Sequence, residues 1–200
     1  MDERLQAVVV AGHSGDEAIA RGALSDESPT IRAAALGALR RMDALTSEDL
    51  RAALQDSDSG VVIRAAELAV VTHDVDLVDL TTRRDSRVVE TAAWALGERG
   101  PGQPEAVVQR LVELTTHSDA LVREAAVAAL GSIGDPAGLP AVLAGTADKA
   151  AVRRRAVVAL AAFDGPDVDA ALRRATEDRD WQVRQIAEDL LAPPPANSRE

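Results

Sequence analysis

The sequence has no cysteine and few aromatic residues, and both absences narrow what the chain can do. Without cysteine it can form no disulfide, no thiolate metal site and no cysteine nucleophile. Aromatic residues make up 2% of the chain, as two Trp, one Phe and no Tyr, so the core must consist of Ala, Val, Leu and Ile. A chain this poor in aromatics also lacks the stacking side chains that hold single-stranded nucleic acid.

Positive charge and long apolar runs are scarce as well. The chain has 22 basic residues, of which only Lys149 is lysine, against 33 acidic ones, for a net charge of −11. Binding to nucleic-acid phosphates needs a surplus of Lys and Arg, so we expect no nucleic-acid partner. The apolar segment 5–12 follows Asp2 and Glu3 and is too short to span a membrane, so we expect no membrane partner and no secretory signal. The expected location is cytoplasmic, and the arginine-rich usage indicates a GC-rich, bacterial genome.

The sequence does contain one apolar pattern that repeats along the chain. Val122 is followed by apolar residues three, four, seven and eight positions later, which places one apolar stripe on a helix. In the second copy of the pattern, the apolar stripe could start at Val62 or at Ile63. Val62 is preferred, because a stripe that starts at Ile63 would bury Glu67. A period near 30 residues is typical of stacked helix pairs. The pattern starts at six anchor residues: Ile31, Val62, Val88, Val122, Val152 and Val183.

Capping residues divide each repeat into two helices. Side chains three positions before the anchors are predicted N-caps, and five of the six carry an oxygen that can accept a first-turn N–H: Ser28, Ser59, Asp85, Asp119, Lys149 and Asp180. The segment from Thr46 to Asp49 is a capping box that opens a first helix. We expect one domain over 1–192, with a cap helix at 2–12 and a disordered tail at 193–200. Its predicted repeats are about 16–42, 46–72, 74–100, 103–134, 136–164 and 166–192.

These units resemble HEAT repeats of the short type first noted in phycobilisome lyases, from about residue 16 to 191. The resemblance is carried by a D-x-x-x-x-[VI]-R turn and an A-A-x-x-A-L-G helix. The turn is matched by Asp26 with Arg32, Asp58 with Arg64, and Asp178 with Arg184. In the family such pairs form a ladder between neighbouring repeats. Here Arg83, His117 and Ala147 replace the Asp and Val89 replaces one Arg, so the resemblance implies a weaker ladder in the middle.

The resemblance implies an all-α fold, a right-handed α-solenoid of about six stacked helix pairs, with the second helices on the concave side. Some proteins of this type are enzymes: deoxyhypusine hydroxylase holds two irons through His-Glu pairs on its second helices. No His-Glu dipeptide occurs here, and His13, His73 and His117 fall in separate predicted turns. The glycine-rich segment 97–104 lacks the Lys of a phosphate loop. We therefore expect no catalytic residue, no metal and no cofactor.

One basic cluster raises the alternative of DNA binding, because a related repeat fold includes alkylpurine DNA glycosylases. The cluster joins residues 153–155 to Arg173 and Arg174. The acidic chain lacks the stacking groups and phosphate contacts of those enzymes. We therefore interpret the cluster as a solvated, ion-paired face.

The two tryptophans have different predicted roles. Trp181, two residues before Val183, is expected to pack on the preceding repeat. Trp94 lies six residues after Val88, roughly 140° from the centre of the buried stripe, so it is expected to face outward on the concave side. The alternative is that Trp94 folds onto the adjacent helix. The predicted partner-binding surface contains Leu36, Arg64, Leu68, Glu90, Trp94, Glu124, Val127, Arg154 and Val158.

This pattern favours a non-catalytic scaffold that binds another protein or a peptide through its concave face. An alternative is an accessory, chaperone or degenerate lyase subunit for a cofactor-bearing protein, against which the missing tyrosine and the turn-placed histidines count. A third interpretation is a fragment of a larger regulator, because the N-terminus begins almost inside the repeat pattern.

Overall fold

The structure is a computed structural model that describes residues 2–192, and this part of the chain is helical without a strand. Its contacts divide it into two compact units, Met1–Arg99 and Gly100–Glu200, which are described separately. The predicted single domain over 1–192 stays a prediction. The tail predicted to be disordered at 193–200 lies outside the described residues.

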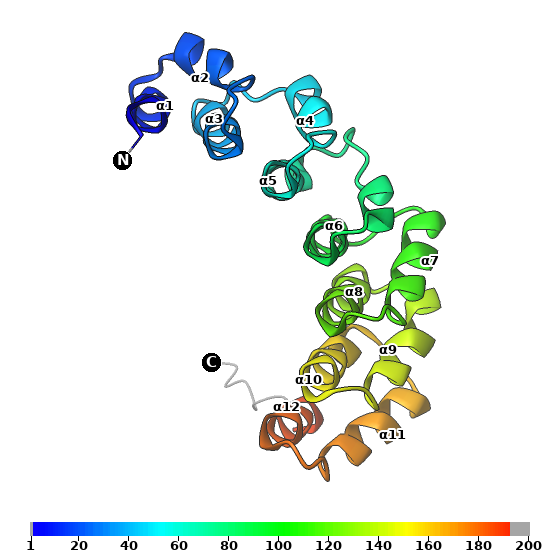
Figure 1. The fold of residues 1–200 in the computed structure, drawn as a ribbon. Helices are drawn as coiled ribbons and strands as arrows, with labels where there is room; N and C mark the ends of the chain where they lie inside the picture. Colours follow the sequence, from blue (N-terminus) through cyan, green and yellow to red (C-terminus); the bar gives the residue numbers. More distant parts are fainter. Residues whose placement is uncertain (1, 193–200) are drawn as a thin grey trace, which may run out of the picture. The chain divides into compact units, whose positions relative to one another are not determined.

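The first unit has two layers of helices (Figure 1). One layer contains α1 (Glu3–Ser14), α3 (Pro29–Arg41), α5 (Ser59–Leu68) and α6 (Ser86–Glu98). The other contains α2 (Glu17–Ala23), α4 (Ser47–Ala53) and the 3₁₀-helix η2 (Val78–Thr82). A further 3₁₀-helix, η1 (Ala69–Val71), continues α5. In the predicted third repeat, 74–100, the first helix is therefore short and is the single 3₁₀ element η2.

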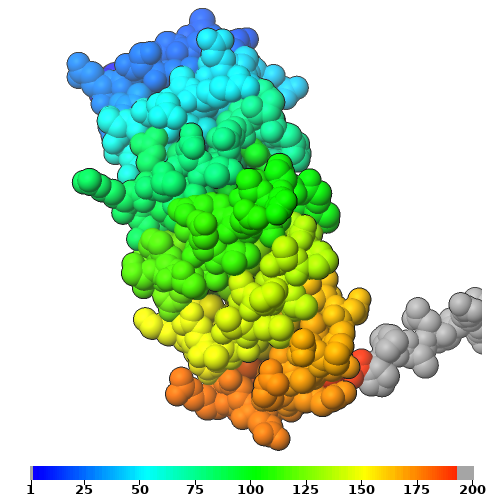
Figure 2. Space-filling model, turned by 90° about the vertical axis from the view of Figure 1, so that its right-hand side faces the viewer, coloured from blue at the N-terminus to red at the C-terminus, as the bar shows by residue number. Residues whose placement is uncertain are grey.

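The second unit repeats the two-layer arrangement. One layer contains α8 (Ala120–Ile133), α10 (Ala150–Ala159) and α12 (Trp181–Leu191), and the 3₁₀-helix η4 (Leu160–Ala162) extends α10. The other contains α7 (Glu105–Leu114), α9 (Leu139–Gly145) and α11 (Pro166–Ala175), with η3 (Pro136–Gly138) before α9. Within each unit the colour bands of the space-filling view follow the sequence (Figure 2), as in a stack where each helix pair packs on the preceding pair.

The anchor residues hold the two layers together. All six anchors are buried, each no more than 3% exposed. Val62 is buried while Glu67 is exposed, so the choice of Val62 over Ile63 is confirmed. Alanines fill much of the rest of the stripe, and their small side chains let helices approach closely. At Gly131 of α8 even a methyl group would not fit, because a Cβ there would lie 2.6 Å from the Cβ of Ala159. The fold is therefore the predicted all-α solenoid class.

Aspartate caps determine where most of the helices that carry an anchor residue begin. Three of the predicted caps accept a first-turn N–H: Asp85, Asp119 and Asp180. Ser28 and Lys149 occupy the N-cap position without a side-chain hydrogen bond. The prediction of Ser59 is wrong, because Asp58 caps α5 and its carboxylate accepts two backbone N–H groups of the first turn.

Arginine–aspartate pairs link successive turns inside each unit, as the resemblance implied. In each pair the arginine donates to both carboxylate oxygens, which stabilises one turn against the next. These hydrogen bonds lower the pKa of Asp56, Asp148 and Asp178 below the ordinary aspartate value. The pairs are Arg4–Asp26 and Arg32–Asp56 in the first unit, and Arg123–Asp148 and Arg153–Asp178 in the second.

Three details of the predicted ladder are wrong. The acid that pairs with Arg32 is Asp56, because Asp58 is occupied as a helix cap. The acid missing at position 147 is supplied one residue later, by Asp148. Arg64 pairs inside its own helix instead of forming a rung.

The predicted substitutions in the middle of the chain have distinct effects. Val89 is buried, and its side chain has no N–H group that could donate to a ladder carboxylate. His117 keeps part of the aspartate role, because its Nδ1 accepts the Asp119 N–H at 3.1 Å. Asp26 makes the corresponding bond to the N–H of Ser28 at 2.8 Å. Histidine therefore preserves the local turn without supplying a carboxylate for a rung.

Candidate functional site

The predicted binding surface lies on the helices that carry the anchors: α3, α5 and α6 in the first unit, and α8, α10 and α12 in the second. We call these the anchor helices. The side that an anchor helix turns away from the other layer is called its open side. Because consecutive residues are about 100° apart on a helix, the open side is formed by positions two, six and nine after the anchor.

Two of the predicted surface residues are not on the open side. Leu36 and Val127 are both 0% exposed, so their assignment to an exposed surface is wrong. Each lies five residues after its anchor, on the flank of the helix. Neighbouring anchor helices cover this flank, because α5 contacts α3 and α10 contacts α8. The apolar pattern does not distinguish position five from position six, although the two differ by about 100° around the helix.

Apolar residues six positions after the anchor do reach solvent. Trp94 of α6 is 41% exposed, and Val158 of α10 is 45% exposed. Leu68, at the same position of α5, is half-buried. The expectation that Trp94 faces outward is confirmed. Its role in binding, like that of Leu68 and Val158, stays a prediction.

In the first unit, charged residues flank these apolar side chains. Arg64 and Glu90 are both half-buried. A guanidinium nitrogen of Arg64 lies 3.0 Å from the Glu67 carboxylate. The same guanidinium crosses to α3, where it would lie 3.2 Å from a Cβ placed on Gly37. Glycine at position six of α3 therefore makes room for the arginine of α5.

The second unit has a similar polar border. Glu124 of α8 lies 3.6 Å from Arg155 of α10. Arg154 donates to the side-chain oxygen of Gln182 and lies 3.9 Å from the carboxylate of Asp180. These contacts join neighbouring anchor helices across their open sides. The interpretation of the basic cluster as an ion-paired face is thus supported for residues 154 and 155.

Trp181 is exposed, contrary to the prediction that it packs on the preceding repeat. It is the first residue of α12, and 65% of its surface is accessible. Two residues before the anchor correspond to roughly 140° from the centre of the buried stripe, which turns the side chain away from the core. Helix geometry applied to Trp181 as it was to Trp94 would have found this second exposed indole.

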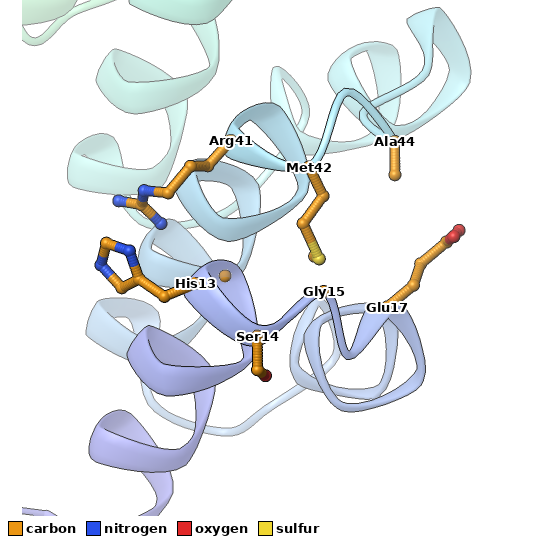
Figure 3. A pocket seen from close by; sticks show the side chains of 8 residues that line it. His13, Ser14, Gly15, Glu17, Arg41, Met42 and Ala44 are labelled. Atoms are coloured by element: carbon orange, nitrogen blue, oxygen red, sulfur yellow. The ribbon is translucent and has the colours of Figure 1, made fainter.

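A shallow pocket that the sequence did not reveal lies in the first unit (Figure 3). It has a volume of about 390 Å³ and is lined by Gly12, His13, Ser14, Gly15, Glu17, Arg41, Met42 and Ala44. His13 and Arg41 lie near one end and Glu17 near the other. Glu17 is paired with Arg21 at 2.6 Å, and the Ser14 hydroxyl donates to a backbone carbonyl. The pocket thus pairs neither its serine with a base nor its histidine with the carboxylate.

The structure brings together no constellation typical of catalysis in residues 2–192. Within that range no group of three or more His, Asp or Glu side chains is placed to hold a metal ion. His13 and His73 are exposed and His117 is half-buried in its turn. No helix in the described part of the chain is long and apolar enough to cross a membrane.

Comparisons with known proteins agree with this architecture. The family model for HEAT repeats matches residues 76–150 and 108–192. An engineered protein of known crystal structure is 21% identical, with a TM-score of 0.67 and coverage of 96% of this chain and 98% of the other. A designed armadillo repeat protein in complex with the peptide (KR)4 is 17% identical, with a TM-score of 0.65 and coverage of 88% and 97%. No curated protein matches the chain.

Proposed function

Because the chain belongs to the HEAT-repeat family, we propose that it is a non-catalytic scaffold that binds another protein or a peptide on the open sides of its anchor helices. The observation that carries the proposal is the exposure of Trp94 and Val158 at the same position of two repeats. A helix of a stack can bury its apolar stripe against its neighbours, so a large apolar residue on the open side adds nothing to that core. Trp is also enriched among residues that dominate binding energy.

Two further points support this function. A solved structural neighbour, the designed armadillo repeat protein, is bound to a peptide. The net charge of −11 disfavours nucleic acid as the partner. The proposed partner is neither a nucleic acid nor a membrane, and the proposed location is cytoplasmic, as predicted from the sequence.

A peptide library of unbiased composition, panned against the immobilised full chain, tests the function. Peptides that bind the unaltered protein should lose affinity for Trp94→Ala or Val158→Ser, because these changes remove the open-side contacts. Trp181→Ala is the control, since it removes a more exposed indole that lies in the first turn of the last anchor helix, α12, and not at the position six that Trp94 and Val158 share. If the selected peptides lose affinity only for Trp181→Ala, or if no peptide is enriched, the proposal is wrong.

A further inference from the structure

One arginine of α12 is held in the same way as the arginines of the ladder. In Arg32, Arg123 and Arg153, the Nη1 atom donates to a backbone carbonyl five or six residues earlier, at 2.8 or 2.9 Å. Arg184 makes the same contact, because its Nη1 donates to the carbonyl of Asp178 at 2.8 Å. Each of these arginines directly follows an anchor residue, so its side chain leaves the helix in the same direction.

The other edge of the Arg184 guanidinium has no acceptor among residues 2–192. This edge, formed by Nε and Nη2, is called the fork. In Arg32, Arg123 and Arg153 the fork donates to both oxygens of an aspartate, at 2.7 or 2.8 Å. In the described part of the chain, the Asp178 carbonyl is the only acceptor that the half-buried Arg184 side chain contacts. Arg184 therefore has a ladder fork without a carboxylate.

The flank of α12 next to Arg184 is uncovered in the part of the chain that the structure describes. Position five after the anchor is completely buried in α3 and α8, at Leu36 and Val127, because a neighbouring anchor helix covers it. In α12 the same position is Glu188, which is exposed. Trp181 lies seven residues before Glu188, almost two full turns, so both side chains leave α12 on nearly the same side.

Trp181 gives this flank a large apolar surface. Its indole is 65% exposed, and Arg184 follows it by three residues, which makes the two side chains neighbours on the helix surface. A ligand held by the fork can therefore also contact the indole. The five earlier anchor helices carry a compact residue at the position of Trp181, two residues before the anchor: Pro29, Gly60, Ser86, Ala120 and Ala150.

We propose that Arg184 and Trp181 form a second binding site, for an aspartate side chain of a peptide segment that has apolar residues beside the aspartate. Nε and Nη2 of Arg184 donate to the two carboxylate oxygens, as in the three ladder pairs. The apolar neighbours of the aspartate pack on the indole of Trp181. The site lies within the second unit and goes beyond the proposed function, because it does not involve the open-side residues Trp94 and Val158.

The charges near the fork distinguish an acidic segment from other occupants. A basic segment would meet the guanidinium of Arg184 and that of Arg179, an exposed residue of the turn before α12. A purely apolar segment would cover the fork without giving it an acceptor, which carries a desolvation penalty. Glu188 is a like charge for the bound aspartate, so Glu188→Gln should strengthen binding by a few-fold.

The test uses the isotopically labelled full chain and the peptide Gly-Leu-Asp-Leu-Gly, blocked at both ends. NMR spectra follow the Nε–H signal of Arg184, which through-bond spectra assign. Salt at about 0.15 M screens the net charge of −11 beyond about 8 Å. The peptide should move this signal toward those of the ladder arginines, because it supplies the same paired hydrogen bonds. The matched peptide, with asparagine in place of aspartate, should move it far less.

Variants then locate the binding, with affinities taken from the backbone signals of α12. Arg184→Lys should weaken binding by about tenfold, because lysine keeps the charge but has no fork. The matched control is Arg173→Lys, since Arg173 is 70% exposed, and its affinity should stay within about twofold. Trp181→Ala should cost a few-fold through lost apolar contact. Trp94→Ala should change nothing here, so failure of the open-side function and failure of this inference are separate results.

Several results would overturn the assignment. An Arg184 signal that lies among those of the ladder arginines before peptide is added would show that this chain or a second copy already supplies the carboxylate. Equal shifts with the asparagine peptide would show that the carboxylate is not recognised. A shift with inorganic phosphate but not with the aspartate peptide would assign the fork to another anion. If Arg184→Lys does not fold, the Nε–H shift of Arg184 in the unaltered protein decides.

Discussion

The guanidinium of Arg153 donates two hydrogen bonds of 2.8 Å to the carboxylate of Asp178, which lies 25 residues further along the chain. A third bond, of 2.9 Å, goes to the backbone carbonyl of Asp148. The arginine side chain is only 5% exposed. One side chain thus joins the turn that opens its own helix to the corresponding turn of the next repeat.

Arg153→Ala should destabilise the second unit by about 3 kcal/mol, because it leaves the Asp178 carboxylate largely buried without its partner. Urea unfolding followed by circular dichroism at neutral pH measures the change. Arg173→Ala is the control, since Arg173 is 70% exposed and lies 3.8 Å from Asp169. It should cost no more than about 1 kcal/mol. Equal losses in the two variants would show that the buried Arg153–Asp178 pair contributes no more to stability than an exposed ion pair.

Acid should weaken the fold through the ladder. Hydrogen bonds from arginine lower the pKa of Asp56, Asp148 and Asp178 below the ordinary value of 3.8. Near that pH the unfolded chain binds more protons than the folded one, so stability rises with pH there. The contribution is complete above about pH 5 and is lost as the pH falls through the folded pKa values.

A single substitution tests the acid effect. Asp148→Asn removes one of these carboxylates, so the free-energy deficit of the variant should be largest at neutral pH and should shrink below about pH 4. Chemical unfolding of both proteins at a series of pH values gives the deficit. A deficit that stays constant down to about pH 3 would show that protonation of the Asp148 carboxylate does not cause the loss of stability in acid.

The difference between helix positions five and six predicts opposite outcomes for two large apolar residues. Leu36→Ala should cost about 2–5 kcal/mol, because Leu36 is completely buried. Trp94→Ala should cost less than about 1 kcal/mol, because the indole is on the open side and 41% exposed. Denaturant midpoints measure both. A larger loss for Trp94→Ala would mean that the indole belongs to the core. The proposed binding surface would then lose its aromatic contact residue.

Two helical glycines should respond in opposite directions to a methyl group. A Cβ on Gly131 would lie 2.8 Å from the Cα of Ala159, so Gly131→Ala should push α8 from α10 and cost about 1–3 kcal/mol. A Cβ on Gly22 of α2 has nothing within 4 Å. Gly22→Ala should therefore stabilise the protein by up to about 1 kcal/mol through helix propensity. Stabilisation by Gly131→Ala would contradict the close approach of the two helices.

Periodicity was sufficient to predict the layers of the fold. An apolar stripe must be buried, so the anchors and their alanines could be placed from spacing alone, and all six anchors are buried. Local chemistry was equally informative at Thr46 and Asp49, which form the predicted capping box at the start of α4. These features depend on contacts within one helix or on the next helix in the chain.

The details that sequence reasoning missed depend on which neighbour a side chain meets. Leu36 and Val127 were placed on the surface because the pattern identifies the buried stripe but not the flanks that adjacent repeats cover. Asp58 could serve either as a cap or in the ladder, and only the three-dimensional arrangement shows that Asp56 reaches Arg32. The pocket near His13 combines the end of the N-terminal cap helix with residues near both ends of the first repeat, a proximity that no local motif encodes.

The position of the two indoles makes the unfolding of each compact unit separately visible. Trp94 lies in the unit Met1–Arg99, Trp181 lies in the unit Gly100–Glu200, and the chain has no tyrosine. In a pair of single-tryptophan proteins, Trp181→Phe and Trp94→Phe, the intrinsic emission therefore reports on one unit at a time. Coincident transitions would mean that the repeats melt as one cooperative block, whereas separated transitions would make each half an independent folding unit.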